Sequence, residues 1–172
     1  MKILDTERLS LRTINADDAL FYYELVNDPT WLEHIGDKGI RTVAEARTAI
    51  LDGPCVMQQR LGHSLYVMER KSDGLALGLC GLIKRDSLPE VDIGYAIRPA
   101  HFGLGYTYEA AAAVVAYARD VLRLPRLMGI TNPANTVSIN LLAKLGLTFV
   151  EHKVLPPDGR PTNIYCRELL QV

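Results

Sequence analysis

The sequence predicts one α/β domain in which a mixed sheet is flanked by helices. Strand-like and helix-like segments follow one another in the order strand, helices, three strands, helix, strand, helix, two strands, which is typical of a sheet covered by helical layers. The 172 residues are 48% hydrophobic and 23% charged, so a single domain over residues 1–172 can bury a substantial core. A strand that passes through a glycine turn into an alanine-rich helix, at residues 92–122, is the third observation.

The first segment with a clear period is residues 7–14, where apolar and polar residues alternate as in a half-buried strand. Asn15 is a suitable N-cap for the helix that follows, which we expect to end before Pro29. Residues 29–35 are consistent with a second, short helix. The chain therefore enters its first helical layer directly after one strand.

A capping box begins the third helix, because Thr42 is followed three residues later by Glu45. This helix is expected to run to about Leu51 and to be stopped by Gly53 and Pro54. The centre of the chain then favours a sheet, with strands expected over residues 64–69, 75–84 and 91–97.

Alternation within the strand at residues 91–97 gives its two faces different compositions. Val91, Ile93, Tyr95 and Ile97 share one face, and Asp92, Gly94 and Ala96 share the other. The remaining segments are expected to form a helix at 109–122, with Val121 among the residues against the sheet, a strand at 126–131, a helix at 135–145 ended by Gly146, and strands at 147–155 and 162–169.

The turn between residues 97 and 109 has the composition of an anion site. Gly103 and Gly105 precede a helix, whose first turn carries free N–H donors and the positive end of the dipole. Two known phosphate loops are excluded. Tyr108 stands where the dinucleotide fingerprint needs its third glycine, and no Gly-Lys-Ser/Thr run of a Walker loop occurs.

Composition narrows the function classes further. The net charge of −1 without a basic patch argues against nucleic acid as a partner, and no apolar run approaches the ~20 residues that span a membrane. Three widely spaced cysteines and four unpaired histidines favour neither a disulfide scaffold nor a metal site. We therefore expect a cytoplasmic protein without a metal.

Three segments, taken in this order, resemble motifs of one enzyme superfamily. They are residues 6–12 as an opening strand, 92–95 with 102–110 as a pyrophosphate motif, and 132–147 as a second cofactor motif. The chain resembles the GNAT superfamily of acyl-CoA N-acyltransferases, and within it the RimJ/RimL-type branch of ribosomal-protein N-terminal acetyltransferases. The resemblance implies a mostly antiparallel, twisted sheet and acetyl-CoA as the cosubstrate.

The resemblance also implies a role for particular residues in direct attack of an amine on the thioester. A backbone N–H of Ala96 or Ile97 would bind the carbonyl oxygen, and Asn135 would contact the pantetheine arm. Ser138 would protonate the thiolate, since the position at which many relatives have a tyrosine is Leu142. The pyrophosphate would be held by backbone N–H groups of Gly103, Leu104, Gly105, Tyr106, Thr107 and Tyr108.

Asp92 and Glu90 are the candidate bases for the acceptor amine, directly or through water. Simpler roles remain open, because the two carboxylates could be solvated, Asn135 could be an N-cap, and Ser138 could bond a helix carbonyl. Leu104, Thr107 and Tyr108 depart from the family pattern, so a coenzyme A-binding regulatory or interaction module with lost or altered catalysis is the alternative function. A protein N-terminus, a polyamine, an amino acid and an antibiotic amine all remain possible acceptors, and we expect a monomer or a homodimer.

Overall fold

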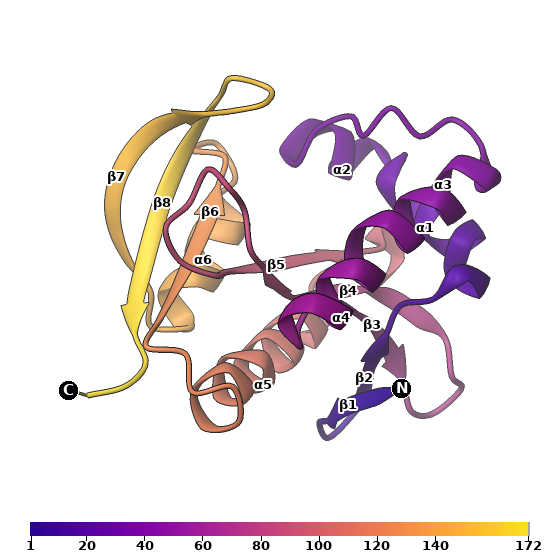
Figure 1. Ribbon diagram of the computed structural model, residues 1–172, viewed down its shortest axis with the longest axis horizontal. Helices are drawn as coiled ribbons and strands as arrows, with labels where there is room; N and C mark the ends of the chain where they lie inside the picture. Colours follow the sequence, from indigo (N-terminus) through magenta and orange to yellow (C-terminus); the bar gives the residue numbers. More distant parts are fainter. Residues whose placement is uncertain (172) are drawn as a thin grey trace.

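A computed structural model describes residues 1–171 (Figure 1). Within them, eight strands form one sheet in the order β1-β2-β3-β4-β5-β6-β8-β7. Neighbouring strands are antiparallel except β5 and β6, which are parallel. The strands are β1 (Lys2–Asp5), β2 (Leu9–Thr13), β3 (Leu65–Arg70), β4 (Ala76–Ile83), β5 (Asp92–Ile97), β6 (Arg126–Thr131), β7 (Thr148–Leu155) and β8 (Arg160–Glu168). The expected mixed, mostly antiparallel sheet is confirmed.

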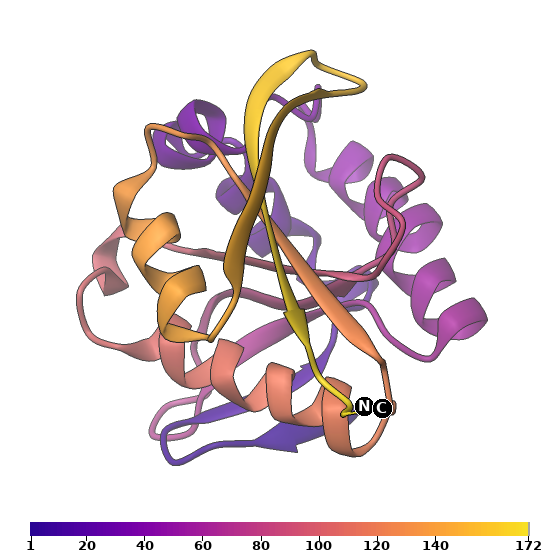
Figure 2. The same ribbon diagram turned by 90° about the vertical axis from the view of Figure 1, so that its left-hand side faces the viewer.

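Helices cover both faces of this sheet (Figures 1 and 2). Buried residues of α5 and α6 form one core with the strands, and α1, α2 and α3 contribute to a second core on the other face. No helix within residues 1–171 is both long and apolar enough to cross a bilayer. The helices are α1 (Ala19–Val26), α2 (Pro29–His34), α3 (Val43–Ile50), α4 (Val56–Leu61), α5 (Tyr106–Asp120) and α6 (Thr136–Lys144).

The capping residues identified in the sequence predicted most helix ends correctly. Thr42 and Glu45 form the expected capping box at α3, and Asn15 accepts a hydrogen bond from the N–H of Asp17 in the short 3-10 turn that precedes α1. Asn135 is the N-cap of α6, and Gly146 follows α6 with a φ of 81°, a left-handed conformation that suits glycine.

In the first half of the chain one expectation is wrong and one strand was missed. Gly53 and Pro54 do not stop α3, because a π-helical stretch at Leu51–Cys55 carries the helix on into α4. The wider turn accommodates a proline that lacks an N–H and crowds the preceding turn. The strand β1 was also not expected, since its four residues are too few to show a period; it is held by antiparallel pairing with β2.

Helix α5 begins at Tyr106, three residues earlier than the sequence pattern indicated. Residues 106–108 therefore form its first turn rather than part of the preceding loop. The helix also ends earlier, at Asp120, and the side chain of Val121 is 63% exposed beyond it. The expectation that Val121 lies against the sheet is wrong, because the residue follows the last helical turn.

Candidate active site

The parallel strands β5 and β6 separate soon after they meet. Their paired register covers only Asp92 with Met128 and Ile93 with Gly129, although β5 continues to Ile97. Beyond Ile93 the edge of β5 that faces β6 has no ladder partner among the described residues. The sheet therefore opens at its centre, between the strand that leads to the glycine turn and the strand that leads to α6.

Alternation decides which N–H groups face this opening. The N–H of Arg98 donates to Leu77 in β4 (2.8 Å), and the carbonyl of Val91 accepts from Met128 in β6 (2.9 Å). Because N–H and C=O groups alternate sides along a strand, odd-numbered residues of β5 face β6 and even-numbered ones face β4. The N–H of Ile97 thus faces the opening, whereas that of Ala96 faces β4, which favours Ile97 of the two expected donors.

The glycine turn next to this opening is exposed, and its backbone adopts a conformation that glycine accepts without strain. Gly103 and Gly105 have φ angles of 73° and 81°, in the left-handed region. Gly105 is the N-cap of α5, and no side chain of residues 1–171 caps this helix end. The first N–H groups of α5, those of Tyr106, Thr107 and Tyr108, remain available to a ligand.

Ser138 lies in the first turn of α6 and faces β5. Its hydroxyl lies 2.7 Å from the hydroxyl of Tyr95, so the alternative in which it bonds a helix carbonyl is wrong. Burial raises the pKa of the Tyr95 hydroxyl to about 12, although the bond with Ser138 lowers it. Both hydroxyls therefore keep their protons at neutral pH and can act as donors.

Asn135 and Leu142 lie on the same helix, with different environments. The Asn135 side chain accepts a hydrogen bond from the N–H of Ser138 (3.2 Å), so its interpretation as an N-cap is confirmed. Leu142 is fully buried, and a Cβ added at Gly129 would lie 2.6 Å from its Cδ2. A core position of this kind cannot present an acid to a thiolate.

The candidate bases lie toward the other face of the sheet. Asp92 is fully buried, so the interpretation as a solvated carboxylate is wrong for this residue. The Nε of Arg85 donates to its Oδ1 (3.0 Å), while Oδ2 is buried without a partner among the described residues. Burial raises the pKa of Asp92 to about 6, although the charge and hydrogen bond of Arg85 lower it. Glu90 precedes β5 and is half-buried.

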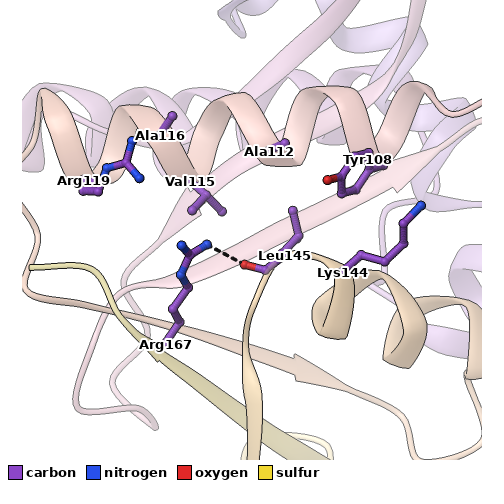
Figure 3. A pocket seen from close by; sticks show the side chains of 8 residues that line it. All are labelled: Tyr108, Ala112, Val115, Ala116, Arg119, Lys144, Leu145 and Arg167. Atoms are coloured by element: carbon purple, nitrogen blue, oxygen red, sulfur yellow. Dashed lines mark hydrogen bonds between the residues drawn. The ribbon is translucent and has the colours of Figure 1, made fainter.

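A small cavity of about 130 Å³ lies between α5 and the C-terminal end of α6 (Figure 3). The Nζ of Lys144 stands 4.5 Å from the centre of the Tyr108 ring, and Arg167 donates to the carbonyl of Leu145 (2.7 Å). The lining contains three cationic side chains and no carboxylate: it consists of Tyr108, Ala112, Val115, Ala116, Arg119, Lys144, Leu145 and Arg167.

Two neighbours of the expected residues were not identified from the sequence. Tyr95 was assigned only to an apolar strand face, although a tyrosine hydroxyl on such a face needs a hydrogen-bond partner, and this need was the available signal. Arg85 lies in the loop before β5, and nothing in its local sequence indicated a partner.

No group of three metal-ligating side chains occurs within residues 1–171.

Comparison with known proteins agrees with this geometry. The acetyltransferase (GNAT) domain family matches residues 8–148. YkkB of Bacillus subtilis (strain 168) is 27% identical, over 96% of this chain and 95% of that protein. The uncharacterized N-acetyltransferase p20 of Bacillus licheniformis is also 27% identical, over 99% and 97%. The structure of RimL, a ribosomal L7/L12 α-N-protein acetyltransferase in complex with coenzyme A, superposes with a TM-score of 0.82 at 18% identity, over 98% of each chain.

An opened sheet beside a helix N-terminus and a matching family profile define an acyltransferase. More specifically, the chain belongs to the GNAT acetyltransferase family, because that family matches well over half of its length.

Proposed function

We propose that the enzyme transfers an acetyl group from acetyl-CoA to a primary amine by direct attack on the thioester. The observation that carries this proposal is the opening between β5 and β6, which ends at the uncapped N-terminus of α5. A pantetheine arm is narrow and extended, so it can occupy the opening and pair with the free edge of β5. The thioester would then lie beside Ile97 and Ser138.

The phosphates of coenzyme A are assigned to the glycine turn and the cavity beside it. Backbone N–H groups from Gly103 to Tyr108 would bind the pyrophosphate, since they combine free donors with the positive end of the α5 dipole. The cationic cavity that contains Lys144 and Arg167 suits the remaining phosphate of the cosubstrate.

The chemistry is divided between the two faces of the sheet. At the opening itself, the N–H of Ile97 would stabilise the oxyanion. On the α6 face, Ser138 would donate a proton to the departing thiolate, with Tyr95 bonded to it at 2.7 Å as the second hydroxyl. On the opposite face, Asp92 would receive the proton of the amine through an ordered water, because its carboxylate is too deeply buried for direct contact. Glu90 is the alternative base.

The acceptor amine is proposed only as a class. RimL acetylates a protein α-amine by its name, so a protein N-terminus is one candidate, and a small-molecule amine is the other. The three cysteines at residues 55, 80 and 166 are free thiols, which suits action in the reducing cytoplasm.

Two measurements test this function. Isothermal titration calorimetry with coenzyme A should show binding at one site, and an acceptor screen with acetyl-CoA should release free coenzyme A with a product heavier by one acetyl group. The second candidate function is a coenzyme A-binding module without turnover, which the inaccessible Asp92 and the buried Leu142 favour. Binding without turnover over the whole amine panel would support that alternative, and absence of binding would exclude both.

A further inference from the structure

The opening segment of the chain, residues 6–9, contacts the glycine turn and α5 at several points. Glu109 accepts hydrogen bonds from the Thr6 hydroxyl (2.6 Å), the Arg8 N–H (2.7 Å) and the Arg8 Nε (2.7 Å). The Nη1 of Arg8 donates to the carbonyl of Leu104 (2.9 Å), and its guanidinium lies over the Tyr106 ring at 4.2 Å. We call Thr6, Arg8 and Glu109 the brace.

The bond from Arg8 to Leu104 fixes the direction of one peptide group. A trans peptide points its C=O and its N–H to opposite sides. Because the C=O of Leu104 points at Arg8, the N–H of Gly105 in the same peptide points away from the brace. Gly105 has a φ of 81° and no side chain, so this peptide can rotate at little steric cost unless something outside the turn holds it.

We propose that Arg8 and Glu109 are positioning residues for the cosubstrate, because they hold the Leu104–Gly105 peptide with its N–H, rather than its carbonyl oxygen, presented to the pyrophosphate. This inference rests on the proposed function of the turn. Thr6 and the backbone N–H of Arg8 keep Glu109 in place, so the brace joins the first segment of the chain to a helix more than 100 residues away.

The brace and the negative charge of Glu109 predict opposite effects on coenzyme A binding when this side chain is removed. The carboxyl is ionised at neutral pH, since burial raises its pKa but the hydrogen bonds from Thr6 and Arg8 outweigh burial and lower it overall. A negative charge beside an anion site opposes binding, so removal of that charge alone would tighten binding of coenzyme A. Removal of the brace would weaken it, because the peptide becomes free to rotate.

The principal variant is therefore Glu109→Ala, which places a good helix former in α5. We expect its dissociation constant for coenzyme A, measured by calorimetry, to rise about tenfold, equivalent to ~1.4 kcal/mol. In steady state, the KM for acetyl-CoA should rise by a similar factor, while kcat at saturating acetyl-CoA stays within about twofold. Arg8→Lys keeps the positive charge but loses the planar fork, and it should also weaken binding several-fold.

The matched control is the exposed pair of Arg126 on β6 and Glu168 on β8, which is likewise an arginine–carboxylate pair. Glu168→Ala and Arg126→Lys should leave binding of coenzyme A unchanged. Thermal unfolding of every variant shows whether the fold is kept, and only folded variants are compared.

Unchanged or tighter binding of coenzyme A by folded Glu109→Ala would overturn the brace, as would wild-type affinity in Arg8→Lys. These results differ from a failure of the proposed function, in which the wild-type protein itself would not bind coenzyme A. If neither variant folds, Glu109→Gln replaces them. Its amide oxygen can still accept from Thr6 and the Arg8 N–H, but its NH2 group is only a donor and cannot accept from the Arg8 Nε, so the guanidinium is released and binding should again weaken; equal or tighter binding by that variant would likewise overturn the proposal.

Discussion

A buried carboxylate at residue 92 should lower the stability of the folded protein at neutral pH. The side chain is fully buried, and burial raises its pKa from an ordinary 3.8 to about 6. Between these two values the folded protein retains a proton that the unfolded chain has lost. Stability due to this group is therefore fully present below pH 4, falls as the pH rises to 6, and stays lower above it.

The size of the effect follows from the same values. Each pKa unit corresponds to about 1.36 kcal/mol, so a rise from 3.8 to about 6 corresponds to about 3 kcal/mol. Asp92→Asn has a similar shape and does not titrate. Relative to the wild type, this variant should gain up to about 3 kcal/mol of unfolding free energy between pH 4 and pH 8.

Urea unfolding of both proteins across pH 4–8 measures this difference, because all other titrating groups cancel when the two curves are subtracted. Asp73→Asn is the control. Asp73 lies in an exposed turn, where the hydrogen bond from Arg70 lowers its pKa to about 2, so its difference curve should be flat over this range. A flat curve for Asp92→Asn, or one with the opposite slope, would refute the reasoning.

The same variant links stability to activity. If Asp92 receives the amine proton through water, Asp92→Asn should lower kcat at pH 7 by about 10²-fold, with partial recovery as the pH rises and more of the amine is neutral. An activity curve identical to that of the wild type would leave the carboxylate without a catalytic role.

Three further outcomes are expected. Gly105→Val should raise the dissociation constant of coenzyme A at least tenfold, because the position has a φ of 81° and an added Cβ lies 3.3 Å from a guanidinium nitrogen. The control is Gly74→Val, at a position with a φ of 72° and open space around it. The control should lose as much stability as Gly105→Val but bind coenzyme A normally. Ser138→Ala should lower kcat about 10²-fold without weakening binding, and Tyr95→Phe should lower it less; a wild-type rate in Ser138→Ala would return the serine to a structural role. Lys144→Gln should weaken coenzyme A several-fold but leave dephospho-coenzyme A unaffected, which competition calorimetry would reveal.

The sequence by itself determined the structural features that depend on residues close to one another in the chain. The capping box at Thr42 and Glu45, the N-cap at Asn15 and the left-handed glycine at 146 depend on residues within one turn of each other, and the structure has each of them. The glycine turn before α5 is equally local, and the order of motifs was sufficient to identify the family.

Only the tertiary structure decided which side chains meet. Tyr95 reaches Ser138 from 43 residues away, and Arg8 reaches Glu109 from 101 residues away. Such contacts depend on strand register, on the opening between β5 and β6, and on the side to which each residue alternates, and none of these is a property of a short segment. The burial of Asp92 is likewise decided by the folded structure, because a strand pattern gives the face on which a side chain lies but cannot distinguish a buried carboxylate from a solvated one.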